Sequence, residues 1–319
     1  MRVIITGGGG FLGSQLCQKL LERGTLTGTN GAEEPVEEIV LLDAQFHQPA
    51  IAGVKQLVGS VDSRDAIRGA IDGHTNTSIF HLASMVSGEC EERFDDALRV
   101  NLDGGRNIFE AARELGGKTR VVFASSIACF GGDAMQEPCT DQTKVTPQTT
   151  YGMTKAICEL FINDYSRKGF FDGRSARLPT VIIRPGKPNA AASSWASGMF
   201  REPLSGTACL LPVHRDQRHP MTGYRTVIDS LIAIHELPSE ALGRDRAIGL
   251  PAMSVTPRLA EQALREVAQE LNLSLGAIED TPDTRIQGIV DQWPVAVDGS
   301  RALALGLPPV LSLQTIIRH

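Results

Sequence analysis

The sequence has no long apolar run. Its opening hydrophobic segment, residues 3–5, is short and is soon followed by four glycines. A secretory signal needs a longer apolar core, and a membrane-spanning helix needs about 20 apolar residues. We therefore expect neither, and we expect a cytoplasmic protein without a membrane partner.

The sequence also lacks the patterns of a metal site or a disulfide framework. None of its six cysteines forms a C-x-x-C pair, and none of its seven histidines lies four residues from another. No metal site is therefore expected. The cysteines are expected to be buried or incidental thiols, which a cytosolic compartment keeps reduced. They are Cys17, Cys90, Cys129, Cys139, Cys158 and Cys209.

Positive charge is not in excess. Lysine and arginine total 31 against 37 aspartates and glutamates, a net charge of −6. A nucleic-acid partner requires a basic surface to neutralise phosphates, so none is expected. The 319 residues are 42% hydrophobic and 21% charged, which is ordinary for a soluble globular protein. This length suits one larger domain with a smaller second one.

Glycine is abundant in one place, the turn after the first apolar segment. Gly7, Gly10 and Gly13 follow the buried β-branched residues 3–5, and Phe11 and Leu12 begin a helical apolar stripe. Such glycines permit a tight turn, close approach of the backbone to a pyrophosphate, and close packing of helix on sheet. The pyrophosphate would lie on free N–H groups at the helix N-terminus. A plain glycine-rich loop is the alternative, which the flanking strand and helix disfavour.

An acidic residue follows the second predicted strand. Residues 39–42 form this strand after a surface insertion at residues 24–39, and Asp43 ends it. In a dinucleotide fold, a carboxylate here binds the adenine-ribose hydroxyls and repels a 2′-phosphate, which favours NAD over NADP. The alternative is an aspartate that caps a helix or stabilises a turn.

Strands and helices continue to alternate. We predict strands at residues 55–59, 78–83 and 120–124, and helices at residues 66–71, 94–115 and from Thr150. Val61 and Asp62 follow the third strand, where Asp62 either caps the next helix or meets the adenine edge. Asn101 interrupts the long helix, either as a solvent-facing amide or as a kink or hydrogen-bond relay.

This alternation indicates an α/β fold with a doubly wound parallel sheet. Ligands of such sheets bind beyond the carboxyl ends of the strands. Gly10, Asp43, Ser84 and Ser126 are all predicted to lie there.

Tyr151 and Lys155 are four residues apart and share one face of the predicted helix. An apolar stripe of Met153, Ile157 and Leu160 lies roughly opposite, so the pair alone is compatible with an ordinary polar helix face. With a dinucleotide turn and Ser126, it becomes a catalytic set. A phenol with a pKa near 10 is a poor base, and a neighbouring ammonium favours its phenolate.

Five motifs in this order, TGGGGFLG, Asp43, SIFHLAS, ASSIACFGG and YGMTK, resemble the extended short-chain dehydrogenase/reductases of the NAD-dependent epimerase/dehydratase superfamily. IIRPGKPN at residues 182–189 and VDGSRALALGLPP at residues 297–309 extend the resemblance. It implies a Rossmann fold and Tyr151 as acid/base, with Lys155 also holding the nicotinamide ribose and Ser126 bonding the substrate oxygen. It further implies NAD contacts from Leu82, Ala83, Ser125 and Pro185, and a homodimer formed through the tyrosine helix.

Two regions bear on the reaction. Thr226, Val227, Ile228 and Asp229 replace the family's histidine-valine-x-aspartate run, which weakens the case for a nucleotide-sugar substrate. Residues 177–206 are small and polar, which suits a short polyhydroxy acid. The same segment resembles that of sugar-acid dehydrogenases within the superfamily, and this resemblance implies NAD-dependent oxidation of the 2-hydroxyl of a four-carbon sugar acid.

The alternatives are a nucleotide-sugar epimerase or dehydratase that does not consume NAD, and an NAD-sensing protein without catalysis. Candidate substrate residues are Ser84, Ser126, Tyr151, Ser194, Trp195 and Arg201, and Arg184, Arg218 and Arg225 are further candidates to bind a carboxylate.

The domain prediction follows from these regions. Residues 1–176 are expected to bind NAD, and residues 177–319 mainly the substrate, with residues 210–240 returning to the first domain. A helix is predicted at residues 256–273, and a strand followed by a helix at residues 291–306.

Overall fold

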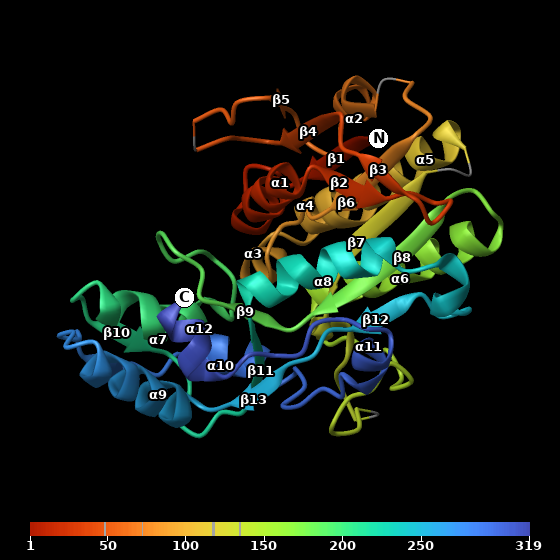
Figure 1. Ribbon diagram of the computed structural model, residues 1–319. Helices are drawn as coiled ribbons and strands as arrows, with labels where there is room; N and C mark the ends of the chain where they lie inside the picture. Colours follow the sequence, from red (N-terminus) through yellow and green to blue (C-terminus); the bar gives the residue numbers. More distant parts are fainter. Residues whose placement is uncertain (48, 72, 117–118, 134) are drawn as a thin grey trace.

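A seven-stranded parallel sheet organises the computed structural model, which describes residues 1–47, 49–71, 73–116, 119–133 and 135–319 (Figure 1). The strand order is β5–β4–β1–β6–β7–β8–β12, so the order reverses beside β1. The strands are β1 (Arg2–Thr6), β4 (Glu38–Asp43), β5 (Val54–Val58), β6 (Thr77–His81), β7 (Arg120–Ser126), β8 (Asp172–Leu178) and β12 (Ala247–Gly249).

Both faces of this sheet are covered by helices, which confirms the predicted doubly wound fold. Alternate residues of β1 point to opposite cores, with Val3 and Ile5 in one and Ile4 in the other. The first core includes side chains of α1 (Phe11–Arg23), α8 (Tyr224–Glu236) and α11 (Ser300–Ala304). The second includes side chains of α2 (Arg64–Ile71), α5 (Gly104–Leu115) and α6 (Thr150–Arg167).

A smaller lobe is built mainly from the C-terminal part of the chain and has its own apolar core. Figure 1 shows it below the sheet, with α9 and α7 at its outer end. Its strands are β9 (Thr180–Ile182), β10 (Cys209–Leu211), β11 (His219–Gly223), β13 (Met253–Val255) and β14 (Ile278–Asp280). Its helices are α7 (Ser194–Leu204), α9 (Pro257–Glu270), α10 (Thr284–Val290) and α12 (Leu313–Arg318).

The return of the chain to the main sheet is broader than residues 210–240. Within that range α8 packs on β7 and β8, whereas β10 and β11 belong to the smaller lobe. Beyond it, β12 pairs with β8, and α11 packs in the first core. The assignment of the two parts to cofactor and substrate stays a prediction.

The remaining elements connect these layers. The predicted insertion forms a hairpin of β2 (Thr25–Thr27) and β3 (Glu33–Pro35). The long helix predicted at residues 94–115 is α4 (Phe94–Ala97), a π-helical segment (Leu98–Asp103) and α5. The other helices are α3 (Ser87–Glu92) and two 3-10 turns, Ile127–Cys129 and Ser239–Leu242.

The prediction of a strand at the start of residues 291–306 is wrong. Val297 forms only an isolated bridge with Cys139, and α11 follows. The Glu137 carboxylate accepts hydrogen bonds from the backbone N–H groups of Val295 and Ala296, at 2.8 and 3.0 Å. A side chain therefore satisfies backbone donors that a neighbouring strand would otherwise bind.

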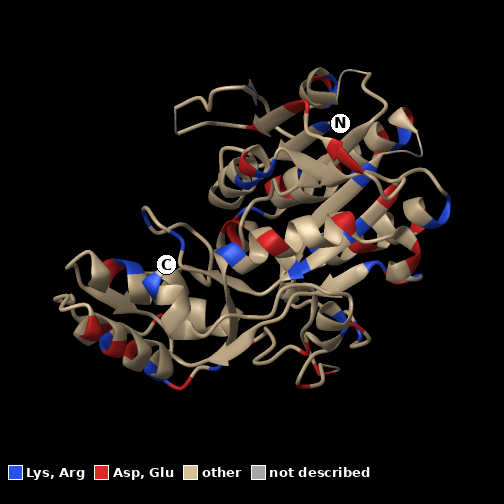
Figure 2. Ribbon diagram, in the orientation of Figure 1, with Lys and Arg blue, Asp and Glu red and all other residues tan. Residues whose placement is uncertain are grey.

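Charged residues of both signs are interspersed over the surface, as Figure 2 shows along α9. All six cysteines are buried and unpaired, as predicted. Within the described ranges, no His, Cys, Asp and Glu side chains gather into a group suited to a metal. A search of the same residues finds no helix with the length and apolar character needed to span a membrane.

Candidate active site

The glycine turn joins β1 to α1 and leaves room that a side chain would fill. Gly7 has a φ of +73°, and a Cβ added to it would lie 2.7 Å from the backbone nitrogen of Ala83. A Cβ on Gly13 would lie 2.2 Å from the carbonyl oxygen of Gly7. Gly10 caps α1 with extended backbone and no side-chain hydrogen bond, and all three glycines line one cavity. This cradle fits a pyrophosphate.

Asp43 lies beside this turn, at the carboxyl end of β4. Its Oδ2 accepts a hydrogen bond of 2.9 Å from the Gly9 backbone N–H, and its Oδ1 accepts one of 3.3 Å from Gln45. No helix begins there, so Asp43 is not a helix cap. It does stabilise the local turn, and its carboxylate remains partly exposed at the position predicted for the adenine ribose.

Asp62 does not cap the following helix. The hydroxyl of Ser63 accepts a hydrogen bond from Ala66 at 3.3 Å and takes that place, whereas Asp62 forms an ion pair with Arg99. Val61 is buried beneath α5, where its side chain meets Gly104. Of the two roles predicted for Asp62, the helix cap is therefore wrong, and Ser63 was not predicted as the cap.

Ser126 and Tyr151 meet at the wall of the cavity. Ser126 ends β7, and its hydroxyl accepts a hydrogen bond of 3.1 Å from Ala128. Tyr151 lies in the first turn of α6, which Thr149 caps by accepting from Gly152 at 3.1 Å. Burial raises the pKa of Tyr151, and its hydrogen bond with Ser126 opposes this rise.

Lys155 lies one helical turn further along α6 and is 4% exposed. Its ammonium donates a hydrogen bond of 2.8 Å to the carbonyl oxygen of Ala124 and lies 5.4 Å from the ring centre of Tyr151. Burial lowers the pKa of Lys155 to about 8. The structure thus brings Ser126, Tyr151 and Lys155 together, and each lines the same cavity.

The alternative of an ordinary amphipathic helix, with the Tyr151–Lys155 face in water, is wrong for α6. The sheet-facing side carries Lys155 and Glu159, both 4% exposed, whereas Leu160 is 68% exposed. Met153 and Ile157 are only partly buried. The apolar stripe faces outward because the face with Lys155 and Glu159 packs on β7 and β8, where its polar groups are hydrogen-bonded.

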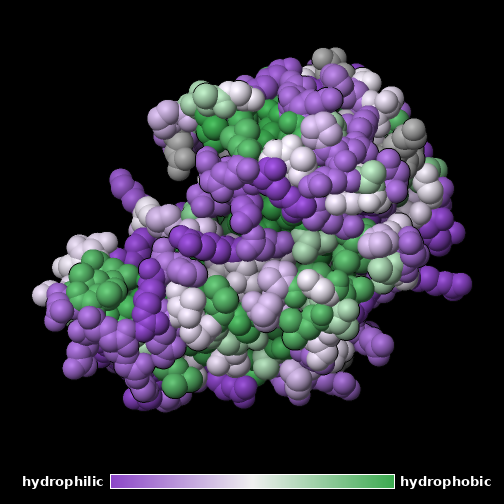
Figure 3. Space-filling model, viewed as in Figure 1, coloured by the Kyte–Doolittle hydropathy of each residue, from purple (hydrophilic) through white to green (hydrophobic). Residues whose placement is uncertain are grey.

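The cavity has a volume of about 410 Å³ and lies between the sheet and the smaller lobe, where Figure 3 shows an indentation at the left. Among its lining residues, Lys155 and Arg184 are cationic and none is Asp or Glu. The polar lining includes Ser84, Ser87, Ser125, Ser126, Tyr151, Thr180, Asn189, Ser193, Ser194 and Ser197. Such a lining suits an anionic, hydroxyl-bearing ligand.

The other predicted site residues fall into three groups. Phe11, Leu12, Leu82, Ser84, Ser125 and Ser194 line this cavity, and Ala83 adjoins Gly7. Trp195 and Arg201 instead line a neighbouring cavity of about 460 Å³, which also touches Ser194. Pro185 is exposed and lies outside both linings.

The four arginines predicted as candidates to bind the substrate carboxylate lie in different parts of the fold. Arg184 lines the main cavity, and Arg201 pairs with Glu202 at 2.5 Å. Arg218 and Arg225 are exposed and contact Ser254 and the C-terminal His319, respectively.

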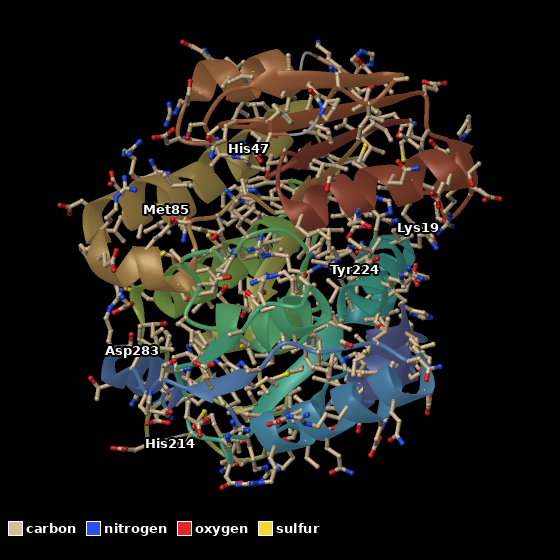
Figure 4. All side chains as sticks on the ribbon, turned by 90° about the vertical axis from the view of Figure 1, so that its left-hand side faces the viewer. Lys19, His47, Met85, His214, Tyr224 and Asp283 are labelled. Atoms are coloured by element: carbon tan, nitrogen blue, oxygen red, sulfur yellow. The ribbon has the colours of Figure 1, made fainter. Side chains whose placement is uncertain are left out.

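Asn101 is not a solvent-facing amide. It is 4% exposed, and its side chain accepts a hydrogen bond of 2.7 Å from the backbone nitrogen of Met85 and donates one of 3.2 Å to its oxygen. Met85 lines the cavity on the sheet side, and Figure 4 shows it far from His214 and Asp283 in the smaller lobe. The π-helical widening around Asn101 accompanies this contact.

Sequence reasoning missed Thr180, Asn189, Ser193 and Trp293 in the cavity lining. Trp293 comes from a loop at least 100 residues beyond the other three, and no motif surrounds it. Only chain packing brings it to the site.

Comparisons with known proteins show the family of this chain. The model of a family described as the NAD dependent epimerase/dehydratase family matches residues 3–247. A D-erythronate dehydrogenase of Cupriavidus necator is 44% identical over 319 residues, covering 100% of this chain and 97% of that protein. A D-erythronate dehydrogenase of Haemophilus influenzae is 39% identical, covering 100% and 98%.

A solved structure is similar over the same length. It is described as the nucleoside-diphosphate-sugar epimerase from Agrobacterium tumefaciens, is 39% identical, and has a TM-score of 0.88 with 99% of this chain and 92% of that chain covered. Family, fold and cofactor thus agree with the resemblance seen in the motifs. The chain belongs to the NAD dependent epimerase/dehydratase family and is an NAD-dependent dehydrogenase with a Rossmann fold.

Proposed function

We propose that this protein oxidises the 2-hydroxyl of D-erythronate, a short sugar acid, to 2-oxo-erythronate with reduction of NAD. The observation that carries the proposal is a cavity that joins Ser126, Tyr151 and Lys155 to a wall of hydroxyl groups and Arg184, without an acidic lining residue. The full-length similarity to two proteins named D-erythronate dehydrogenase supports the same substrate.

The catalytic roles follow from the residue types and their placement. When bound, NAD supplies the acceptor for the hydride that leaves the substrate carbon. Ser126 holds the reacting oxygen by a hydrogen bond, and Tyr151 takes the hydroxyl proton. Lys155 favours the phenolate of Tyr151 electrostatically, since its ammonium lies beside that ring.

The substrate carboxylate is proposed to bind Arg184. Burial, and then the positive charge of Arg201, lower the pKa of Arg184, so an anion at this position is favoured. The backbone of Arg184 is held at both ends, because its N–H donates to Ser197 at 3.1 Å and its oxygen accepts from Arg201 at 3.0 Å. Ser84, Ser194 and Tyr151 are proposed to contact the substrate. Trp195 and Arg201, which line the neighbouring cavity, are proposed to support this side of the site.

The cofactor is proposed to lie along the carboxyl ends of β1, β4 and β6. Gly7, Gly10 and Gly13 hold the pyrophosphate with Phe11 and Leu12, and Asp43 binds the adenine ribose. The proposed cofactor contacts also include Val61, Asp62, Leu82, Ala83, Ser125, Tyr151, Lys155 and Pro185. Of these, Leu82, Ser125, Tyr151 and Lys155 line the cavity, whereas Val61, Asp62, Ala83 and Pro185 do not.

The test is net formation of NADH from NAD and D-erythronate, with the 2-oxo product trapped by a carbonyl reagent. A nucleotide-sugar epimerase is the second candidate, favoured by the description of the solved Agrobacterium relative. Such an enzyme returns the hydride within its cycle, so a UDP-sugar would be converted without net NADH. That result, with inert D-erythronate, would replace the proposal.

We also propose a cytoplasmic homodimer formed through the outer face of α6. The support is its exposed apolar stripe, in which Leu160 is 68% exposed, together with nearby Phe94, which is 51% exposed. Sedimentation of the wild type and of Leu160→Glu tests this, because a buried charge at a dimer interface favours the monomer.

A further inference from the structure

Glu159 is a buried carboxylate one helical turn beyond Lys155 on α6. Its side chain is 4% exposed, and both of its oxygens accept hydrogen bonds. Arg177 of β8 donates from Nε to Oε1 at 3.0 Å and from Nη2 to Oε2 at 2.8 Å. Ser125 of β7 donates to Oε1 at 2.5 Å. One carboxylate thus links three elements of the fold.

The hydrogen bond from Ser125 of β7 to Glu159 lies next to the proposed catalytic residues. Ser125 follows Ala124, whose carbonyl oxygen accepts the hydrogen bond from Lys155, and precedes Ser126, which bonds Tyr151. The serine comes from β7, whereas the tyrosine and lysine come from α6. Their geometry therefore depends on how this helix lies against the end of this strand, and the bond between Ser125 and Glu159 fixes that relation.

Arg177 is itself held by a second carboxylate. Its Nη1 lies 3.6 Å from Asp141, whose other oxygen lies 3.0 Å from Arg301 of α11. Asp141 also accepts a hydrogen bond of 2.7 Å from the backbone of Gly249 in β12. Glu159, Arg177, Asp141 and Arg301 thus form a chain of alternating charges that reaches the edge of the sheet. Removal of one of these charges leaves its neighbour in the chain without its partner.

We propose that Glu159 is a positioning residue that holds Ser126 and the Tyr151–Lys155 pair in register. It touches neither of the groups that transfer the proton; it acts through Ser125 and through its charge. This inference rests on the proposed roles of Ser126, Tyr151 and Lys155, but not on the identity of the sugar acid.

The charge of Glu159 has a separate consequence for Lys155. The titratable groups around Lys155 are Tyr151, Cys158 and Glu159 on α6, Cys90 on α3 and His81 on β6. Burial raises the pKa of Cys90 to about 11 and that of Cys158 to about 12, and lowers that of His81 to about 3, so these groups are neutral near pH 7. The Glu159 carboxylate therefore supplies the negative charge that favours the ammonium.

The experiment compares Glu159→Gln with the wild type and with a matched control. Glutamine keeps an acceptor for Ser125 but removes the charge. Asp172→Asn is the control, because the Asp172 carboxylate is only 11% exposed and lies at the opposite end of the β7–β8 pair, where it is bound by Arg120, Arg174 and Arg246. Thermal unfolding and the affinity for NADH, followed by fluorescence, are measured for each variant.

We expect Glu159→Gln to lower kcat about tenfold through misplacement of the catalytic groups, with NADH affinity changed less than about twofold. The alkaline limb of its pH profile should move to lower pH, because Lys155 loses the charge that favours its ammonium. Ser125→Ala should lower kcat without moving that limb. Asp172→Asn should lower the unfolding temperature without either effect.

The inference would be overturned if Glu159→Gln left both kcat and the alkaline limb of the pH profile unchanged. It would also be overturned if Asp172→Asn changed kcat and this limb by the same amounts as Glu159→Gln. The kinetic comparison uses whichever sugar acid the wild type oxidises. A wrong substrate proposal therefore appears as wild-type inactivity with D-erythronate alone, whereas a wrong role for Glu159 appears in the comparison between variants.

Discussion

The ammonium of Lys155 donates a hydrogen bond of 2.8 Å to the carbonyl oxygen of Ala124, two residues before Ser126 on the same strand. The end of β7 thus holds both the ammonium proposed to favour the Tyr151 phenolate and the hydroxyl that bonds Tyr151. This relation explains how a helix and a strand that are separate in sequence bring the proposed catalytic groups together.

Tyr151→Phe should lower kcat by about 10²–10⁴-fold, the usual contribution of a general base. NADH affinity should remain within a factor of about two, because only the hydroxyl is removed and the ring still packs in α6. Steady-state rates and fluorescence titration measure the two effects. Turnover that survives the substitution would contradict the role of Tyr151.

Asp43→Ala should relax the preference for NAD over NADP by about tenfold in the ratio of kcat/KM, equivalent to about 1.4 kcal/mol. The carboxylate would no longer repel a 2′-phosphate. Asp65→Ala on the exposed side of α2 removes the same charge away from the cavity and should leave the ratio unchanged. An unchanged ratio in both variants would mean that Asp43 serves only its turn.

Arg184→Gln should raise the KM for the sugar acid roughly 10–100-fold, since a charge-assisted hydrogen bond to a carboxylate contributes about 1.5–3 kcal/mol. Arg218→Gln is the control, because Arg218 is an exposed arginine outside the main cavity. Initial rates over a range of substrate concentrations at saturating NAD distinguish the two. Equal KM values for Arg184→Gln and wild type would place the carboxylate elsewhere.

The pKa of Lys155 predicts the alkaline behaviour of the enzyme. Burial lowers this pKa to about 8, so kcat/KM should fall as the ammonium deprotonates above about pH 8. The folded pKa is below the ordinary Lys value of 10.5, so the unfolded chain binds the proton more tightly between these values. Stability should therefore gain from Lys155 as the pH rises from about 8 to 10.5.

Lys155→Met tests the stability part directly. It should raise the free energy of unfolding at pH 7 by roughly 1–3 kcal/mol, because the buried ammonium is removed. The gain should shrink toward pH 10. Lys55→Met on the exposed edge strand β5 should show no such pH dependence in denaturant titrations. A gain at Lys155 that is constant with pH would contradict the lowered pKa.

Gly13→Ala should destabilise the fold by about 1–3 kcal/mol, because its Cβ would lie 2.2 Å from the Gly7 carbonyl oxygen. It should also weaken NADH binding at the turn. Gly69→Ala in α2 is the matched control, with no heavy atom within 4 Å of the added Cβ, and should stabilise the protein by about 0.5–1 kcal/mol. Urea titrations compare them, and similar values for both would contradict close packing at Gly13.

The sequence by itself determined the features that depend on local order. Apolar residues 3–5, the glycine spacing and the alternation of strands and helices predicted the doubly wound sheet, because hydrophobic period and turn chemistry are written along the chain. The same order placed Ser126 at a strand end and Tyr151 one helical turn before Lys155.

Tertiary packing decided what depends on contacts between distant segments. It turned the apolar stripe with Leu160 outward, buried Asn101 against Met85, and chose Ser63 over Asp62 as a helix cap. It also selected Arg184 among the arginines and brought Trp293 to the cavity. No local sequence pattern predicts these outcomes, because each depends on which surfaces of the sheet and the smaller lobe come into contact in the folded protein.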